Sequence, residues 1–335
     1  MKNFFIYSLQ INKVNFSWFY LGFFIFFGQV SWAQSVPSIE ENIPFLVTFG
    51  KDSETSWGDN NFRQSFYALI PKDHGSEVFI RVFDPDVGGM FDEVNGVFDT
   101  KTRFMVFGGV NCWSSIGKGE PESNNDIYSG ILLASKTFGN DPKYDGKWYT
   151  FGPFNPAEGE FVEKFNGYVF KIIAEGGEGD DGNLYRYFLS ASSTENIEVE
   201  GGNMFTYEYT FRLSDNAEQV SQIYPYIDDE TISIKISNFD WDYDGEIKII
   251  SVAKNGVFAD VSGDDNWVYN EFPIVEEEKN TSIQIQFIKS KKISVKDNNV
   301  TIVVQNQYGE SLPFYVLPIG GVPVFRPKIK MKPIY

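Results

Sequence analysis

The stretch that decides the fold class is Phe205-Thr206-Tyr207-Glu208-Tyr209-Thr210-Phe211. Aromatic and polar side chains alternate along it, so four aromatic rings fall on one face of an extended chain. The same period of two recurs with isoleucines at residues 231–237 and again at residues 283–287. A period of two is typical of a β-strand that buries one face.

Other short runs of apolar and aromatic residues predict further strands. Clusters of Gly, Asn, Asp and Pro separate these runs, and such clusters are typical of hairpin turns. No stretch of twelve residues sustains a helical period, so we expect an all-β fold. The predicted strands are residues 45–49, 65–70, 78–83, 103–107, 131–134, 148–151, 168–174, 185–191, 247–252, 300–305 and 314–317.

A polar segment at residues 214–219 marks a predicted domain boundary. Residues 41–213 have many strands and long loops, which favours a larger, jelly-roll-like β-sandwich. Residues 222–324 have the length of an immunoglobulin-like β-sandwich. Residues 325–335 are basic and interrupted by proline, so we expect a disordered tail or a linker.

Residues 1–33 have the features of a signal peptide. Lys2 and Lys13 supply positive charge, residues 18–27 are apolar, and Ser31-Trp32-Ala33 suits cleavage before Gln34. The apolar run is shorter than the roughly 20 residues that a membrane span needs, although an uncleaved N-terminal anchor is an alternative. We therefore expect an exported protein of the periplasm, outer-membrane surface or extracellular space, with no transmembrane segment after signal removal.

The chain is strongly acidic, which restricts its partners. Its formal charge is −18, and removal of Lys2 and Lys13 with the signal takes it to −20. Such a charge repels nucleic acid and anionic lipid headgroups and favours the capture of cations. Cys112 is the only cysteine, so no intrachain disulfide can form.

The first candidate calcium loop follows the predicted strand 78–83. Its acids are Asp84, Asp86, Asp92 and Asp99, and Gly88-Gly89 allows the loop to bend. Carboxylate and carbonyl oxygens on a bent loop are the ligands that Ca²⁺ requires. The alternative is a solvated loop that is closed by its own Asx turns.

The second candidate calcium loop contains Asp240, Asp242 and Asp244, followed by Gly245. This spacing matches the opening of an EF-hand, but the twelfth position is Ser251 and a strand follows, so an EF-hand is excluded. A strand-flanked calcium loop and an acidic hairpin turn both stay open. Residues 179–183 and 262–266 are weaker candidates of the same kind.

Aromatic residues near these loops raise the possibility of carbohydrate binding. A flat ring can stack on a sugar, although most tryptophans of a β-protein belong to its core. Trp241 stands between two aspartates, and we expect it to be more exposed than the others. The candidate residues are Trp57, Trp113, Trp148, Tyr149, Trp241 and Trp267.

Catalytic motifs are weak in this sequence. His74 is the only histidine and lies in a predicted turn, and the surroundings of Cys112 match no cysteine-nucleophile signature. A carboxylate pair for glycan cleavage stays an alternative, because the chain has many acids. The first candidates for such a pair are Asp84, Asp86, Glu93 and Asp99.

Six further segments are distinctive when taken together: residues 79–85, 108–109, 133–142, 147–154, 179–185 and 320–323. They resemble the exported N-terminal region of bacterial envelope proteins of the OmpA family. The resemblance implies an envelope location and covers most of residues 41–325. It assigns no site residues, and we expect no OmpA-like peptidoglycan-binding domain after Pro327.

The sequence thus predicts a non-catalytic exported or cell-envelope binding or structural protein. Calcium in the acidic loops would stabilise it, and its partner would be an envelope protein or an extracellular glycan. The rival hypothesis is a secreted carbohydrate-binding or glycan-active protein, such as a carboxylate-based glycoside hydrolase or lyase.

Overall fold

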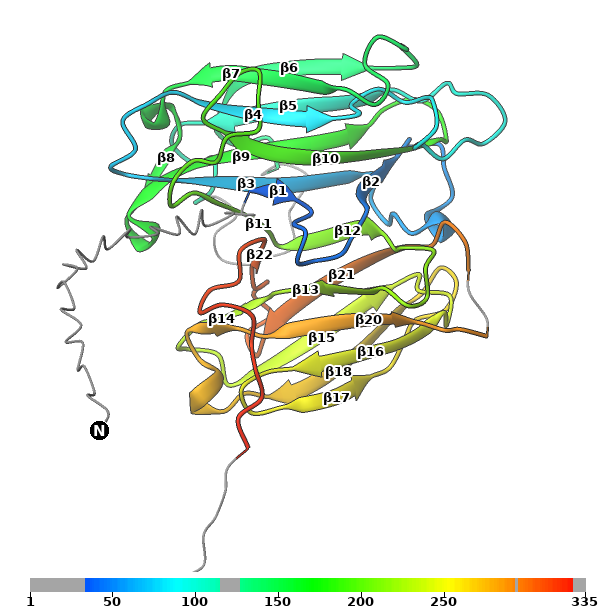
Figure 1. The fold of residues 1–335 in the computed structure, drawn as a ribbon, viewed down its shortest axis with the longest axis vertical. Helices are drawn as coiled ribbons and strands as arrows, with labels where there is room; N and C mark the ends of the chain where they lie inside the picture. Colours follow the sequence, from blue (N-terminus) through cyan, green and yellow to red (C-terminus); the bar gives the residue numbers. More distant parts are fainter. Residues whose placement is uncertain (1–33, 115–126, 293–294, 328–335) are drawn as a thin grey trace, which may run out of the picture. The chain divides into compact units, whose positions relative to one another are not determined.

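The computed structural model describes residues 34–114, 127–292 and 295–327 (Figure 1). The predicted signal peptide and the last part of the predicted tail, residues 328–335, lie outside the described residues. Among the residues described, no helix has the length and apolar character needed to cross a membrane.

The described chain consists of β-strands and four three-residue 3-10 helices, η1 Thr55–Trp57, η2 Pro156–Glu158, η3 Glu163–Phe165 and η4 Glu276–Glu278. The strands of the first half are β1 Ser35–Val36, β2 Phe45–Phe49, β3 Arg63–Pro71, β4 Val78–Phe83, β5 Thr102–Gly108, β6 Ile131–Phe138, β7 Trp148–Phe154, β8 Glu160–Val162, β9 Gly167–Gly176, β10 Gly182–Ser190, β11 Asn203–Thr206 and β12 Glu208–Arg212. Those of the second half are β13 Val220–Ile223, β14 Tyr226–Ile227, β15 Ser233–Phe239, β16 Gly245–Ile250, β17 Asn255–Ala259, β18 Trp267–Pro273, β19 Thr281–Ser282, β20 Gln284–Lys289, β21 Asn299–Asn306 and β22 Phe314–Tyr315.

The prediction of an all-β protein is confirmed. The nine-stranded sheet runs β18-β15-β21-β12-β2-β10-β4-β7, with β1 beside β10. The seven-stranded sheet runs β22-β11-β3-β9-β5-β6, with β8 beside β9. A four-stranded sheet, β13-β20-β16-β17, and the pair β14-β19 complete the fold, and every pairing between the described strands is antiparallel.

Aromatic side chains fill the space between the seven-stranded sheet and part of the nine-stranded sheet. The Phe104 ring of β5 lies 5.1 Å from that of Tyr185 on β10, edge to face. Phe66 of β3 makes the same kind of contact with Tyr187 of β10, at 5.8 Å. All four side chains are buried, so the alternating pattern of the sequence becomes a core between two layers.

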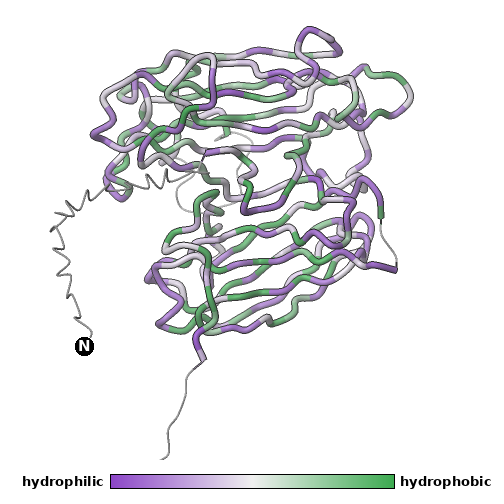
Figure 2. Tube along the Cα trace, viewed as in Figure 1, coloured by the Kyte–Doolittle hydropathy of each residue, from purple (hydrophilic) through white to green (hydrophobic). Residues whose placement is uncertain are grey.

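The other part of the nine-stranded sheet buries its apolar side chains against the four-stranded sheet. Phe287 of β20 contacts Phe211 of β12 at 5.2 Å between ring centroids. Along β15 the burial alternates residue by residue, as a strand with one buried face requires. Figure 2 shows hydrophobic and hydrophilic residues alternating along the strands.

The deciding stretch, residues 205–211, forms two strands instead of one. β11 ends at Thr206 in the seven-stranded sheet, and β12 begins at Glu208 in the nine-stranded sheet. The Thr206 hydroxyl donates to the backbone oxygens of Ser65 and Glu208, at 2.7 and 2.6 Å. These bonds hold the point at Tyr207 where the chain passes from one sheet to the other. The aromatic rings of residues 205–211 therefore pack in two different clusters of buried side chains.

The predicted boundary near residues 214–221 covers the connection after β12 and the first two residues of β13. β12 pairs with β2 on one side and with β21 on the other, so backbone hydrogen bonds join the two predicted halves through this strand (Figure 1). The division into residues 41–213 and 222–324 stays a prediction.

Candidate metal centres and a candidate binding cavity

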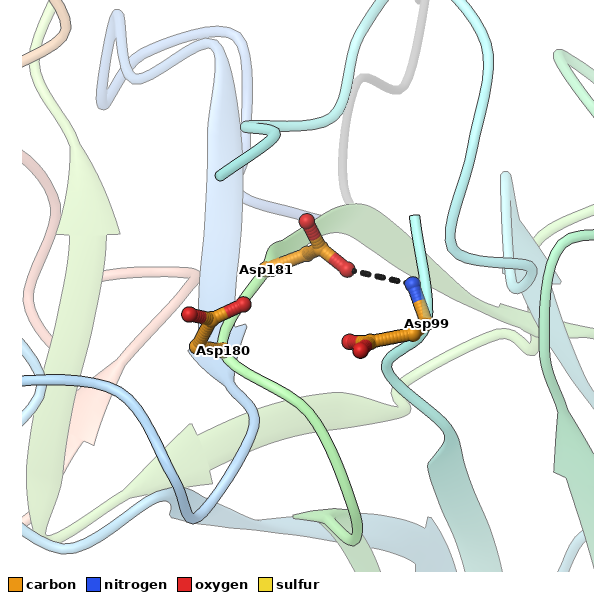
Figure 3. Close-up of side chains that lie close together, drawn as sticks. All are labelled: Asp99, Asp180 and Asp181. Carbon is orange, nitrogen blue, oxygen red and sulfur yellow. Dashed lines mark hydrogen bonds between the residues drawn. The ribbon is translucent and has the colours of Figure 1, made fainter. Parts of the chain in front are cut away.

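The first aspartate triad consists of Asp99, Asp180 and Asp181 (Figure 3). One carboxylate oxygen from each residue lies within 4.8 Å of the others, so the three could hold a metal ion. Asp99 comes from the loop before β5, and the other two come from the turn between β9 and β10. Asp99 therefore clusters with the weaker candidate loop, residues 179–183, although it belongs to the same β4–β5 connection as Asp84.

Asp181 is fully buried, and backbone amides occupy its carboxylate. Oδ1 accepts from the Asn95 amide at 2.9 Å, and Oδ2 accepts from the Asp99 and Thr100 amides at 2.8 and 3.1 Å. The Asn95 side chain also donates to Asp180 at 2.7 Å. With three backbone amides as donors, the Asp181 carboxylate stabilises the loop that carries them without a metal ion.

The second triad consists of Asp240, Asp242 and Asp264, which also bring carboxylate oxygens within 4.8 Å of one another. Asp240 and Asp242 follow β15, and Asp264 lies in the loop between β17 and β18. Burial raises the pKa of Asp240 to about 7, and repulsion from Asp242, Asp264 and Asp265 adds to this effect. Excess negative charge at this turn therefore favours a cation.

Asp244, the third acid of that predicted loop, does not join the triad. Its Oδ2 lies 3.1 Å from Lys289 Nζ, and both side chains are almost fully buried. Asn298 also donates to this oxygen, at 3.3 Å. Asp244 is thus paired with the buried ammonium group of Lys289.

The loop after β4 brings Asp84, Asp86 and Asp92 together. Asp84 and Asp86 are fully buried. Burial raises the pKa of Asp84 to about 7 and that of Asp86 to about 6, and repulsion from Asp145 contributes to both. Burial likewise raises the pKa of Asp92 well above its usual range, although Asp92 accepts from the Gly88 and Leu184 amides, each at 2.7 Å.

The acids that the sequence offered for glycan cleavage do not form an accessible pair. Asp84 and Asp86 have no exposed surface, so a substrate cannot reach them. Glu93 forms an ion pair with Arg212 and accepts from Asn299 at 3.3 Å. Asp99 is exposed and belongs to the first triad.

Cys112 and His74 were the other candidates for chemistry. The Cys112 thiol is buried and donates to the Val169 carbonyl oxygen at 3.3 Å. Burial raises its pKa to about 12, which keeps it in the unreactive thiol form. His74 lies in the turn after β3, and its backbone amide donates to the Pro71 carbonyl at 3.0 Å.

Of the six candidate sugar-binding rings, only Trp241 is fully buried, and the others are partly buried or exposed. The expectation for Trp241 is wrong, because this side chain is fully buried and stacks on Phe287 at 4.8 Å. Trp57 packs on Phe49 at 5.7 Å, and Trp148 packs on Phe83 at 5.4 Å. Trp267 is 42% exposed on β18, an edge strand of the nine-stranded sheet.

Trp113 differs from these, because it lines a cavity of about 310 Å³. The cavity lies between segments of both predicted halves. The other aromatic residues in its wall are Phe165, Tyr207, Tyr226 and Tyr315, and its charged residues are Asp228, Glu230, Glu310 and Lys164.

The aromatic wall of the cavity is held in place by internal contacts. The Trp113 indole donates to the Tyr207 hydroxyl at 3.1 Å, and its ring packs on Phe165 at 5.1 Å. Tyr226 packs on Tyr315 at 5.9 Å, edge to face. Sequence reasoning named Trp113 as a binding candidate but none of the other wall residues, because those come from four other segments with no shared motif.

A scan against protein-family models and a search of curated proteins find no match to this chain. The resemblance to envelope proteins of the OmpA family therefore stays a prediction.

Proposed function

We propose that this chain is a non-catalytic, exported glycan-binding protein. The observation that carries the proposal is the cavity lined by Trp113, Tyr226 and Tyr315 together with carboxylates. Aromatic faces that bind sugar rings and polar groups that orient them are the usual parts of a small-molecule site, and about 310 Å³ suits a short oligosaccharide segment.

The charge of the cavity narrows the class of glycan. Three acids, Asp228, Glu230 and Glu310, face a single lysine, Lys164. This excess of negative charge repels uronic acids and sulfated sugars and favours neutral or amino sugars. The strongly negative net charge of the whole chain, −18, acts in the same direction.

Calcium is the cation that we propose for the triad of Asp240, Asp242 and Asp264. Its ligands would all be oxygens, which suits Ca²⁺. The proposed exported location fits this choice, because calcium-binding modules occur outside the cell, where their affinity is weak.

At the level of domains, we propose a larger jelly-roll-like sandwich and a smaller immunoglobulin-like sandwich that share β12. The ring contacts across both pairs of sheets support this arrangement. We place the protein in the periplasm or at the cell surface, in line with the signal-like residues 1–33.

The test is direct binding of sugars to the mature chain, residues 34–335. Isothermal titration against cellohexaose, xylohexaose, mannohexaose and chitohexaose should give saturable binding for at least one neutral or amino sugar. Trp113→Ala should weaken that binding about tenfold, which corresponds to ~1.4 kcal/mol. Trp267→Ala, which removes a tryptophan outside the cavity, is the matched control and should leave affinity unchanged.

Equal affinity of the Trp113→Ala and Trp267→Ala variants would reject the cavity as the binding site. Sugar cleavage in the same samples would instead favour the glycan-active alternative. For this glycan-cleaving alternative, the candidate catalytic carboxylates are Asp228 and Glu310 in the cavity wall. The double variant Asp228→Asn, Glu310→Gln would then abolish sugar cleavage.

A further inference from the structure

The loop after β4 buries carboxylate oxygens that no protein group satisfies. Asp84 Oδ1 accepts from the Gly146 amide at 2.7 Å, but Asp84 Oδ2 and both Asp86 oxygens are buried and without a hydrogen-bond partner. The amides of Asp86 and Asp141 lie near the Asp86 carboxylate without a bond of ordinary geometry. A buried carboxylate without partners costs several kcal/mol, so these oxygens call for a ligand.

Asn183 brings an unpartnered oxygen to the same loop from a different strand. It lies on β10, which pairs with β4 through Arg186 and Phe83. Its Nδ2 donates at 3.0 Å to the carbonyl of Pro85, the residue between the two aspartates. Its Oδ1 is buried and has no partner. An amide oxygen is neutral, so acidic composition alone does not explain its position.

The charges around this loop are unbalanced. Asp92, Asp141 and Asp145 act electrostatically on Asp84 or Asp86. Arg186 is the cation that acts on Asp84, yet its guanidinium lies 4.3 Å from the Phe45 ring and its Nε donates to the Pro44 carbonyl. Arg186 thus faces away from a direct ion pair with the loop.

We propose that Asp84, Asp86 and Asn183 form a buried site for a divalent cation of the calcium type. Asp84 Oδ2, the Asp86 carboxylate and Asn183 Oδ1 supply oxygen ligands, and Asp145 and Asp92 supply further negative charge. A ligand set made only of oxygens and rich in carboxylates prefers Ca²⁺ over transition metals. The ion ties the end of β4 to β10, its neighbour in the nine-stranded sheet.

This site shares no residue with either aspartate triad or with the aromatic cavity. Its ligands come from β10 and the loop after β4, whereas the cavity residues lie on other segments. Glycan binding and cation binding can therefore fail independently, and the two proposals are tested by different measurements.

Asn183→Asp is the decisive variant, tested in the full mature chain. With a bound cation, the added carboxylate is a stronger ligand, so Ca²⁺ should bind at least tenfold more tightly by chelator competition. In EDTA the same variant should melt below the wild type, because it adds an uncompensated buried charge. Its melting temperature should thus fall in EDTA and rise again in Ca²⁺, short of full recovery because an aspartate cannot donate to the Pro85 carbonyl as Asn183 does.

Asn203→Asp is the matched control, because Asn203 is also a buried asparagine on a strand but bonds to Met204 and Leu317 backbone groups. It should lose equal stability in EDTA and in Ca²⁺. If Asn183→Asp behaves like this control, the proposal is overturned. Asp86→Asn gives a second readout, since it should lower the bound Ca²⁺ by one ion per chain in elemental analysis, and an unchanged content would also reject the site.

Discussion

Asp181 and Asp86 are both fully buried aspartates, next to the neighbouring strands β10 and β4, but their surroundings are opposite. Three backbone amides satisfy Asp181, whereas neither oxygen of Asp86 has a partner. The Asp181 carboxylate stabilises its loop through hydrogen bonds, whereas the Asp86 carboxylate has the properties of a metal ligand. Carboxylates that lie close together therefore do not by themselves identify a cation site. Buried carboxylate oxygens that lack a hydrogen-bond partner are more informative.

The largest effect that we expect comes from Asp181→Ala. The change leaves the amides of Asn95, Asp99 and Thr100 without an acceptor, which should lower the free energy of unfolding by about 3 kcal/mol. Because the loss comes from hydrogen bonds, it should be the same in Ca²⁺ and in EDTA. Urea unfolding under both conditions checks this, and a loss confined to Ca²⁺ would make Asp181 a metal ligand after all.

Glu41 is an intermediate case, because one of its carboxylate oxygens has hydrogen-bond partners and the other has none. Its Oε2 accepts from the Ser38 amide at 2.6 Å and from the Tyr209 hydroxyl at 3.2 Å, and its buried Oε1 has no partner. Burial raises the pKa of Glu41 to about 8. The folded protein therefore keeps a proton that the unfolded chain loses above about pH 4.5.

This difference predicts that Glu41 makes stability fall as pH rises from about 4.5 to about 8, with no further change above that range. Glu41→Gln cannot ionise, so it should remove this part of the pH dependence and gain about 2 kcal/mol over the wild type at pH 8. Chemical unfolding of both proteins at pH 4.5, 6 and 8 measures the effect. Parallel pH profiles for the two would contradict it.

The smallest effect that we expect comes from Asp86→Asn, and its sign should depend on the cation. In EDTA the change removes an unpaired buried charge and should stabilise the fold by about 1 kcal/mol. In millimolar Ca²⁺ it removes a ligand, so the variant should be less stable than the wild type. Thermal melts in both buffers measure this effect. An equal loss of stability in both would show that Asp86, like Asp181, stabilises the fold without binding a metal ion.

The sequence predicted the strands well because burial of one sheet face imposes a local period of two. β2 and β4 have the predicted bounds, Phe45–Phe49 and Val78–Phe83. β17 and β18 were missed because they carry many exposed side chains and their pattern is weak. The acidic loops were also found, since Asp and Gly cluster where the chain turns.

Other features depend on which distant segments pack together, and a local pattern does not contain that information. The alternation at residues 205–211 did not show that the chain changes sheets at Tyr207. The acids around Trp241 suggested exposure, yet its ring packs on Phe287 from β20. The five segments of the cavity wall likewise meet only in the folded chain.

By itself, the sequence determined that this acidic chain forms antiparallel sheets with carboxylates in its turns, because alternation and turn composition act over a few residues. The tertiary structure decided what each carboxylate does. Asp244 pairs with Lys289, Asp181 accepts from backbone amides, and Asp86 follows Pro85, whose carbonyl accepts from Asn183. The physical reason is that the state of a buried charge depends on its nearest partners, and strand pairing brings those partners from far along the chain.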